Sequence, residues 1–306
     1  MLTVEGLHLR AALFRSIRHF FHEKGFLEVD TPVRAPVLLP ERHITPVASD
    51  GWFLQPSPEH CMKRLLARGC RTIFQICPCF RAGERGSRHL FEFTMLEWYR
   101  VDGDYRDLMR DCEELVRYVL DDVAADGRFH RLLDRSCFRT GAAPPPWERL
   151  GVDQAFARHC PETMQQALAA DRFDELLVEH IEPHLGRNGP VFLVDYPTAC
   201  ASLARLKPDD ESTAERFELY IDGMELANGF SELTDSAQQR VRFAEELAAL
   251  GARDGHHREM PETFLRDLST IDAAAGIAFG LDRFLMLLLS VPSIDQAVSF
   301  GPDDLF

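Results

Sequence analysis

Residues 217–230 have the sequence FELYIDGMELANGF, which indicates the fold class of this 306-residue chain. The Asp222-Gly223 pair, placed between β-forming residues, is the strongest short signal for a hairpin with a two-residue turn. Such a turn pairs Ile221 with Met224 and predicts two antiparallel strands in this stretch.

Other segments predict further strands around this hairpin. β-forming residues fill 72–80 and 90–99, and the polar run 81–89 between them predicts antiparallel neighbours joined by a long loop. Residues 191–194 form a short apolar run typical of a buried strand, and the glycine-punctuated residues 276–280 predict another.

Helices are predicted on both sides of these strands. Residues 7–24 place apolar side chains at helical spacing, and Gly25 ends the helix. Residues 104–123 predict a second helix, 148–187 are mostly helical in pattern, and 281–289 predict an apolar helix. Because the strands occur in hairpins rather than in regular βαβ units, the pattern predicts an α+β fold with an antiparallel sheet flanked by helices.

The composition is that of an acidic protein of globular type. The chain has 34 Lys and Arg against 49 Asp and Glu, a formal charge of −15, which argues against a surface that binds nucleic acid throughout. No run approaches the roughly 18 apolar residues that a membrane span needs, and no secretory signal is visible. The eight cysteines show no framework spacing, as is usual for reduced thiols. We therefore expect a single domain over residues 1–306, in the cytoplasm and without membrane contact.

Two carboxylates of the hairpin are candidate metal ligands. With the turn at Asp222-Gly223, Glu218 and Glu225 share a face as diagonal neighbours, roughly 7–8 Å apart at the backbone. Mg²⁺ is commonly held by one or two carboxylates together with substrate phosphates. The alternative is a solvated sheet face with two unrelated glutamates.

A basic window stands out against the acidic chain. Residues 60–88 carry one acid, Glu84, and a local charge of +6, which suits phosphate chemistry or an acidic partner. A solvated helix face explains the first four cations equally well. Arg81 differs because it stands where an apolar strand meets a loop, where a guanidinium can bridge a carboxylate and a phosphate. The cations are Lys63, Arg64, Arg68, Arg71, Arg81, Arg85 and Arg88.

A third pattern, Gly276-x-x-x-Gly280-x-Asp282-Arg283, joins the last predicted strand to its helix. The glycines allow the backbone to approach a flat ligand closely, and Arg283 stands in the first turn of the helix. A structural strand-to-helix turn explains the glycine pair equally well. The sequence contains no P-loop and no dinucleotide-binding glycine motif, which argues against those nucleotide-binding folds.

Together these segments resemble the class II aminoacyl-tRNA synthetases. Residues 24–32 resemble motif 1, which forms the dimer interface of that family. Phe80-Arg81 with residues 92–99 resembles motif 2, and residues 276–283 resemble motif 3. Glu218 and residues 225–233 are similar to the lysine-specific subgroup.

The resemblance narrows to the family of elongation factor P–(R)-β-lysine ligases. The chain enters the motif 1 helix almost at Met1, so we expect no N-terminal anticodon-binding OB domain. Ala278 stands where lysyl-tRNA synthetases usually carry glycine, and the ligase family associates this larger residue with choosing β-lysine over α-lysine. The resemblance implies ATP and Mg²⁺ as cofactors, (R)-β-lysine and elongation factor P as partners, a homodimer, and no tRNA binding.

The resemblance also implies roles for individual residues. Arg81 would bind the α-phosphate and the substrate carboxylate, and Arg283 the γ-phosphate end of a bent ATP, so that these two are the catalytic residues. Glu218 and Glu225 would hold Mg²⁺. The ATP-binding residues would be Arg81, Ala82, Gly83, Glu84, Leu90, Glu225, Leu226, Gly280 and Arg283. The lysine pocket would be lined by Ser57, Pro58, Glu59, Glu97, Tyr99, Asn228, Glu232 and Ala278, with Glu97 and Glu232 supplying negative charge for an ammonium group.

The motif 2 loop departs from the family pattern. Arg81 is followed by Ala82-Gly83-Glu84 where the family commonly has Asn-Glu, so the carboxylate near ATP is Glu84, one place later, or is missing. Leu90 and Phe91 replace an Asn-Pro pair. Two alternatives therefore stand beside the ligase: an adenylate-forming enzyme with another acceptor, such as tRNA, and a catalytically silent paralog that senses amino acid or nucleotide.

The hairpin raises a geometric question of its own. An uninterrupted strand puts Asn228 and Glu232 on the face opposite Glu225. A β-bulge at Gly229 would turn them back toward it.

Overall fold

The predicted hairpin lies within a nine-stranded sheet in the computed structural model, which describes residues 1–138, 141, 146–254 and 258–305. The strand order is β1-β5-β6-β12-β11-β10-β8-β7, and β9 pairs with β10. All neighbours are antiparallel except β1–β5 and β7–β8 at the two edges, so the predicted α+β class is confirmed. The strands are β1 (Leu27–Glu28), β5 (Thr72–Phe80), β6 (Glu92–Val101), β7 (Glu148–Gly151), β8 (Val191–Pro197), β9 (Leu206–Lys207), β10 (Asp210–Ile221), β11 (Met224–Ser231) and β12 (Ala274–Gly280).

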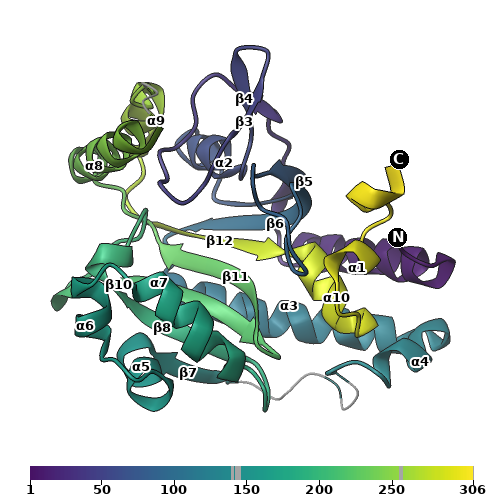
Figure 1. Cartoon of the computed structure of the whole chain (residues 1–306). Helices are drawn as coiled ribbons and strands as arrows, with labels where there is room; N and C mark the ends of the chain where they lie inside the picture. The colour runs from purple at the N-terminus through teal and green to yellow at the C-terminus, as the bar shows by residue number, and fades with distance from the viewer. Residues whose placement is uncertain (139–140, 142–145, 255–257, 306) are drawn as a thin grey trace.

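Helices cover the sheet as Figure 1 shows, with α1 and α3 side by side along one face. At the other end of the picture, α2, α8 and α9 stand beside a small sheet of β2, β4 and β3. The helices are α1 (Val4–Glu23), α2 (Glu59–Leu66), α3 (Tyr105–Ala125), α4 (His130–Leu133), α5 (Val152–His159), α6 (Met164–Ala169), α7 (Phe173–Leu176), α8 (Ser236–Asp254), α9 (Glu262–Leu268) and α10 (Leu281–Leu289), and the small strands are β2 (Arg34–Ala35), β3 (Val47–Ser49) and β4 (Trp52–Leu54).

The helices predicted at 7–24, 104–123 and 281–289 are confirmed as α1, α3 and α10. The predicted helical pattern at 148–187 is wrong for its first four residues, which form β7. Leu150 of β7 is buried, and the segment pairs in parallel with β8. Pairing to a neighbouring strand overrides a weak local helical pattern here.

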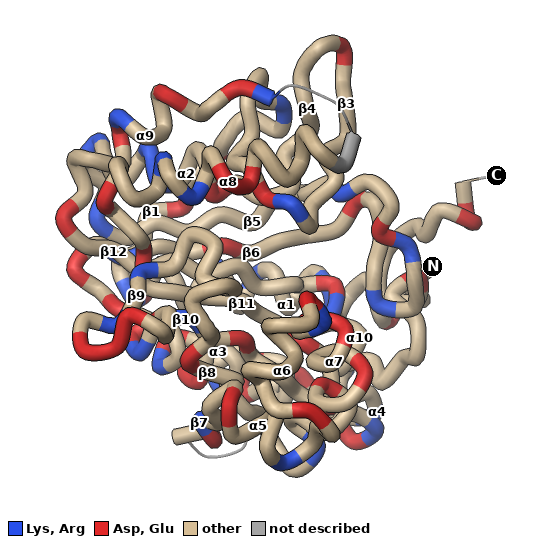
Figure 2. Tube along the Cα trace, turned by 60° about the vertical axis from the view of Figure 1, so that its left-hand side comes forward, with Lys and Arg blue, Asp and Glu red and all other residues tan. Residues whose placement is uncertain are grey.

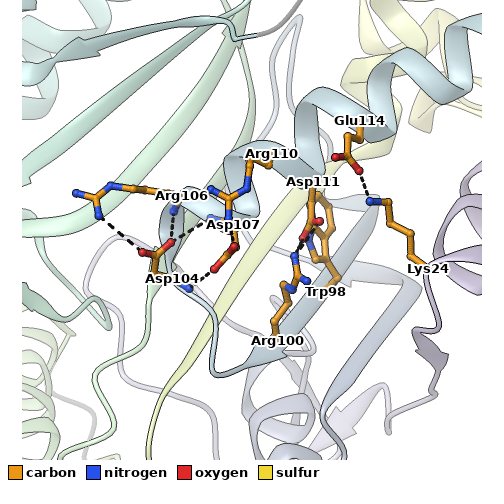
Figure 3. A network of polar contacts seen from close by, with 9 residues as sticks. All are labelled: Lys24, Trp98, Arg100, Asp104, Arg106, Asp107, Arg110, Asp111 and Glu114. Atoms are coloured by element: carbon orange, nitrogen blue, oxygen red, sulfur yellow. Dashed lines mark hydrogen bonds and ion pairs between the residues drawn. The ribbon is translucent and has the colours of Figure 1, made fainter.

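The side chains of strand β6 point alternately to the helix layer and to the opposite face of the sheet. Side chains alternate along a strand, so Trp98 and Arg100 point toward α3, where both bind Asp111 (Figure 3). Trp98 also lies 5.2 Å from the Phe21 ring of α1, measured between ring centroids. Glu97 consequently points away from α1 and α3.

Helix α3 is fixed at its start by a capping box. The Asp104 carboxylate accepts hydrogen bonds from the backbone N–H groups of Arg106 and Asp107, and the Asp107 carboxylate accepts from the backbone of Asp104 (Figure 3). Lys24, at the end of α1, pairs with Glu114 of α3. These contacts hold the helix layer against the back of the sheet.

A β-bulge sets the register of the central hairpin. Tyr220 pairs with Glu225 as the two-residue turn predicts, but Leu226 is then skipped, so that Glu218 pairs with Asn228. The bulge therefore lies at Leu226, and the bulge considered at Gly229 is wrong in position. The extra residue brings Asn228 to the same face as Glu218 and Glu225.

Charged residues are interspersed along the trace, with acidic and basic segments on every side of the view in Figure 2. Within the part of the chain that the structure describes, no helix has the length and apolar character needed to cross a membrane.

Candidate active site

One face of the sheet carries a row of predicted site residues. Glu97 of β6 pairs with Ala278 of β12, Ala278 pairs with Asn228 of β11, and Asn228 pairs with Glu218 of β10. Directly opposed residues point to the same face of a sheet. The register thus brings together residues predicted for the substrate pocket and for the metal.

A cavity of about 220 Å³ opens beside this row. Ala82 and Gly83 do not line the cavity. The Ala82 N–H instead donates to the carbonyl of Thr45 at 2.9 Å, and Gly83 turns the loop with a φ of +81°. The predicted residues that line it are Arg81, Glu84, Leu90, Glu225, Leu226, Asn228, Ala278, Gly280 and Arg283.

Arg283 lies on the wall of this cavity because α10 begins directly after Gly280. Its guanidinium donates to the Glu225 carboxylate at 3.1 Å and to the Glu225 carbonyl at 2.9 Å. It also contacts Nε2 of His89 at 2.7 Å. Burial, followed by the Arg283 cation, lowers the pKa of His89, so a neutral imidazole accepts this hydrogen bond. An anionic ligand can replace the Glu225 carboxylate at this guanidinium.

Arg81 lies on the same cavity with a donor left over. Its guanidinium lies over the Phe93 ring at 5.2 Å from the centroid and 3.8 Å from the Glu84 carboxylate. Its Nε is buried and has no hydrogen-bond partner among the described residues. A buried donor without a partner costs free energy that a ligand oxygen would recover. The arrangement suits a phosphate or a carboxylate.

The two candidate metal ligands differ in their surroundings. Glu225 lines the cavity, whereas Glu218 is buried and does not. The Glu218 oxygens accept hydrogen bonds from Arg216 at 2.6 Å and from the Tyr220 hydroxyl at 2.7 Å. Among the described residues no group of three or more His, Cys, Asp or Glu side chains is placed to hold a metal ion. One carboxylate of the predicted pair, that of Glu225, therefore lies at the cavity surface, where it is paired with Arg283, and the other is buried.

Glu97 belongs to a buried cluster next to the cavity. Its two oxygens accept hydrogen bonds from the Ser57 hydroxyl at 2.6 Å and the Tyr99 hydroxyl at 2.7 Å. Ser57 also accepts from the backbone N–H of Glu59, where Pro58 precedes the start of α2. Burial, and then the nearby charge of Glu59, raise the pKa of Glu97 to about 8.

Glu232 completes the cluster, and Lys63 supplies its cation. The Lys63 ammonium lies 2.5 Å from Oε2 of Glu232 and pairs with Glu59 as well. Burial is the main cause that raises the pKa of Glu232 to about 8, against the lowering effect of Lys63. The carboxylates of Glu59 and Glu232 thus share one ammonium group, and the Glu97 carboxyl is bound by two hydroxyl groups.

Gly276 leaves the space that the cluster occupies. A Cβ atom at this position would lie 2.2 Å from a ring atom of Tyr99 and 2.5 Å from Oε1 of Glu232. The glycine of the motif is needed here for close packing against side chains of the pocket rather than for a turn.

Arg216 and His89 were not among the predicted site residues, and Lys63 was predicted only as a cation of the basic window. Lys63 follows Glu59 by four residues on a helix, a spacing that brings a carboxylate and an ammonium together. Arg216 precedes Glu218 by two residues on a strand and therefore shares its face. Other cations of the basic window pair with acids, Arg64 with Asp267 for example, so the window does not form a free basic patch.

Comparisons with known proteins agree with this geometry. A family profile for tRNA synthetases class II (D, K and N) matches residues 3–304. An elongation factor P–(R)-β-lysine ligase of Pectobacterium carotovorum is 38% identical over 317 residues, which cover 98% of this chain and 95% of that protein. A ligase of the same name from Klebsiella pneumoniae is 36% identical over 318 residues, covering 98% and 96%. The chain therefore belongs to the class II tRNA synthetases of the D, K and N group and, within them, to the family of the elongation factor P–(R)-β-lysine ligases.

Proposed function

We propose that this chain activates (R)-β-lysine with ATP and transfers the β-lysyl group to a lysine side chain of elongation factor P. The relatives carry this activity in their names and match almost the whole chain. Their shared class II synthetase family uses ATP to form acyl-adenylates. We further propose a single catalytic domain that works as a homodimer in the cytoplasm.

The observation that supports an amine substrate most directly is the charge of the buried cluster. Within the described part of the chain, Lys63 is the cation in ion-pair contact with this cluster, through Glu59 and Glu232, whereas Glu97 accepts from two hydroxyl groups. Burial is the main cause that raises the pKa of Glu97 and of Glu232 to about 8, so these two carboxyls hold their protons near neutral pH until a further cation arrives. An ammonium group of a diamino acid would supply the missing positive charge and donate hydrogen bonds to the carboxylates of Glu97 and Glu232.

The first chemical step is attack of the substrate carboxylate on the α-phosphorus of ATP, which releases pyrophosphate. Arg81, with its free Nε, would orient the reacting carboxylate and the α-phosphate, and Arg283 would exchange Glu225 for the far phosphates. Glu225 would hold Mg²⁺ at the cavity surface with Glu218 behind it, and the ion would neutralise phosphate charge. Positioning and charge neutralisation supply most of the acceleration in such a step.

The second step is attack of the acceptor amine on the adenylate, which releases AMP. It needs no covalent nucleophile on the enzyme. The acceptor is protein rather than tRNA in this proposal.

Pyrophosphate exchange tests the proposal when compared across (R)-β-lysine, (S)-β-lysine and L-α-lysine. We expect exchange to be fastest with (R)-β-lysine, followed by a mass gain of one β-lysyl group on elongation factor P. A gain on tRNA alone would assign another acceptor. Absence of exchange with every isomer, alongside measurable ligand binding, would instead indicate a sensor, which the altered loop Ala82-Gly83-Glu84 would then explain.

A further inference from the structure

The segment 276–283 contains a carboxylate to which the proposed function gives no role. Asp282 directly precedes Arg283 in the first turn of α10, is 2% exposed and lines the same cavity as Arg283. Its Oδ1 accepts from the Arg10 guanidinium and its Oδ2 from the backbone N–H of Thr94, each at 2.6 Å. Both oxygens of this buried carboxylate are thus held by other parts of the chain.

Arg10 connects segments that are far apart in the sequence. It lies in α1, and besides Asp282 of α10 its guanidinium binds the Thr94 hydroxyl of β6 at 2.8 Å. It also donates to the carbonyl of Ala297 at 3.3 Å and lies over the Phe14 ring, 4.7 Å from the centroid. Arg10 does not itself line the cavity, so its effect on a ligand there has to pass through the groups that it holds.

The contacts of Asp282 fix the first turn of α10. Gly280, at the N-terminal cap of this helix, has no side chain that could accept from the free N–H groups of the turn. The Arg283 guanidinium is bound to the Glu225 carboxylate, and the proposed function replaces this contact by a phosphate. None of the groups that bind Asp282 takes part in that exchange. They therefore hold the start of the helix while Arg283 changes its partner.

We propose that Arg10 is a positioning residue for the adenylation step: through Asp282 it fixes the first turn of α10 and with it the place of the Arg283 guanidinium at the far phosphates of ATP. The inference rests on the proposed function and adds a residue of α1 to its ATP subsite. Without Arg10, the Asp282 carboxylate would keep the N–H of Thr94 but lose the cation that pairs with it, which is costly for a buried charge. The carboxylate would then move toward water, and Arg283, the next residue of the same helical turn, would move with it.

Direct binding of nucleotides separates this role from a general loss of structure. Arg10→Met keeps an unbranched apolar side chain over Phe14 but removes the charge. We expect it to bind ATP with Mg²⁺ roughly tenfold to a hundredfold more weakly than wild type in calorimetry, because a misplacement of about 1 Å can cost that much. Binding of AMP should be unchanged, since AMP lacks the far phosphates that Arg283 meets. An equal loss for both nucleotides, or unchanged ATP binding, would overturn the role of Arg10.

Arg100→Met is the matched control. Arg100 lies further along β6 and pairs with the buried Asp111 carboxylate at 3.0 Å, and neither residue lines the cavity. The control therefore removes a partly buried arginine–aspartate pair of the same kind. We expect both variants to lose stability in denaturant titrations and only Arg10→Met to lose ATP affinity. A similar loss of ATP affinity in both variants would assign Arg10 to stability alone and overturn the proposal.

A double-mutant cycle tests whether Arg10 acts through Arg283. In the Arg283→Gln background, Arg10→Met should cause little further loss of ATP affinity, because the guanidinium that Arg10 positions is already absent. Losses that add in the double variant would overturn the proposal. Where Arg10→Met does not fold, Arg10→Lys allows the same comparisons, since an ammonium group keeps the charge at Asp282 but lacks the planar fork that also reaches Thr94.

Pyrophosphate exchange distinguishes failure of this inference from failure of the proposed function. With (R)-β-lysine, Arg10→Met should show a raised KM for ATP and an unchanged KM for the amino acid. A wild-type chain that binds ATP but shows no exchange with any lysine isomer would overturn the proposed function and, with it, the role of Arg10 in adenylation. Exchange by wild type, together with an ATP affinity of Arg10→Met equal to that of wild type, would overturn the inference alone.

Discussion

Replacing Glu232 by Gln tests the buried cluster most directly. The side chain keeps its size but loses its charge in a place where it is 1% exposed and lies 2.5 Å from the Lys63 ammonium. In the variant, the ligand ammonium would lose Glu232 as its buried charged partner, and removing one partner of such a pair costs about 3–5 kcal/mol. Glu97 remains beside the site in the variant, so the lower end applies. At about 1.4 kcal/mol for each tenfold change, the affinity for the diamino acid should drop roughly a hundredfold.

The assay is pyrophosphate exchange at saturating ATP, with KM measured for (R)-β-lysine and for ATP separately. The KM for the amino acid should rise about a hundredfold. The KM for ATP should change little, because Glu232 does not line the cavity that contains Arg81 and Arg283. Glu114→Gln, on the far face of the sheet, serves as the control, since it ends only an exposed contact with Lys24. A folded Glu232→Gln protein with an amino-acid KM within threefold of wild type would refute the assignment of the cluster to an ammonium ligand.

Three further outcomes follow from the same geometry. Gly276→Ala should destabilise the fold by about 1–3 kcal/mol in denaturant titrations and abolish amino-acid binding, because its Cβ would meet Tyr99 and Glu232; an unchanged KM would contradict this. Since Glu97 binds its proton more tightly in the folded state, with a pKa of about 8 against the ordinary 4.5, the unfolding free energy of the free protein should fall as the pH rises from about 4.5 to about 8 and level off above that. Saturating (R)-β-lysine should flatten that fall, and a flat profile without ligand would count against it. Arg216→Lys should raise both the KM for the amino acid and the Mg²⁺ concentration at half-maximal activity, about tenfold each. The reason is that the variant loses the hydrogen bonds of the guanidinium to Asn228 and to Glu218. A shift in neither quantity would assign Arg216 to stability alone.

The parts of the fold that the sequence predicted well are those with local turn chemistry. The Asp222-Gly223 hairpin and the strand-to-helix junction at Gly280 lie where the pattern places them, since two or three residues decide each of them. The segments that resemble motifs 2 and 3 both contribute lining residues to one cavity. For Arg81, Arg283 and Glu225, the predicted meeting at a common cavity agrees with the geometry.

The remainder depends on contacts between distant segments. No local signal marks the bulge at Leu226, which alone decides that Asn228 shares a face with Glu225. The strand at 148–151 exists through its pairing with β8 rather than through its own pattern. Lys63 meets Glu232 only because α2 packs against β6, and this contact changes the meaning of a basic window whose composition suggested phosphate binding.

In the ATP subsite and in the amino-acid subsite alike, a cation is paired with carboxylates of the protein itself. Arg283 is paired with Glu225 on the ATP side, and Lys63 with Glu59 and Glu232 on the amino-acid side, so neither subsite keeps a full set of bare buried charges in the free protein. At Arg283 and at Lys63 a ligand therefore exchanges partners, and the gain from each new contact there is offset by the internal pair that it replaces. Glu97 has no such cation within its own hydrogen bonds, which come from two hydroxyl groups. Arrival of the substrate ammonium should then expel a proton from Glu97, and binding of the diamino acid near pH 7 should release protons to buffer while binding of ATP alone should not.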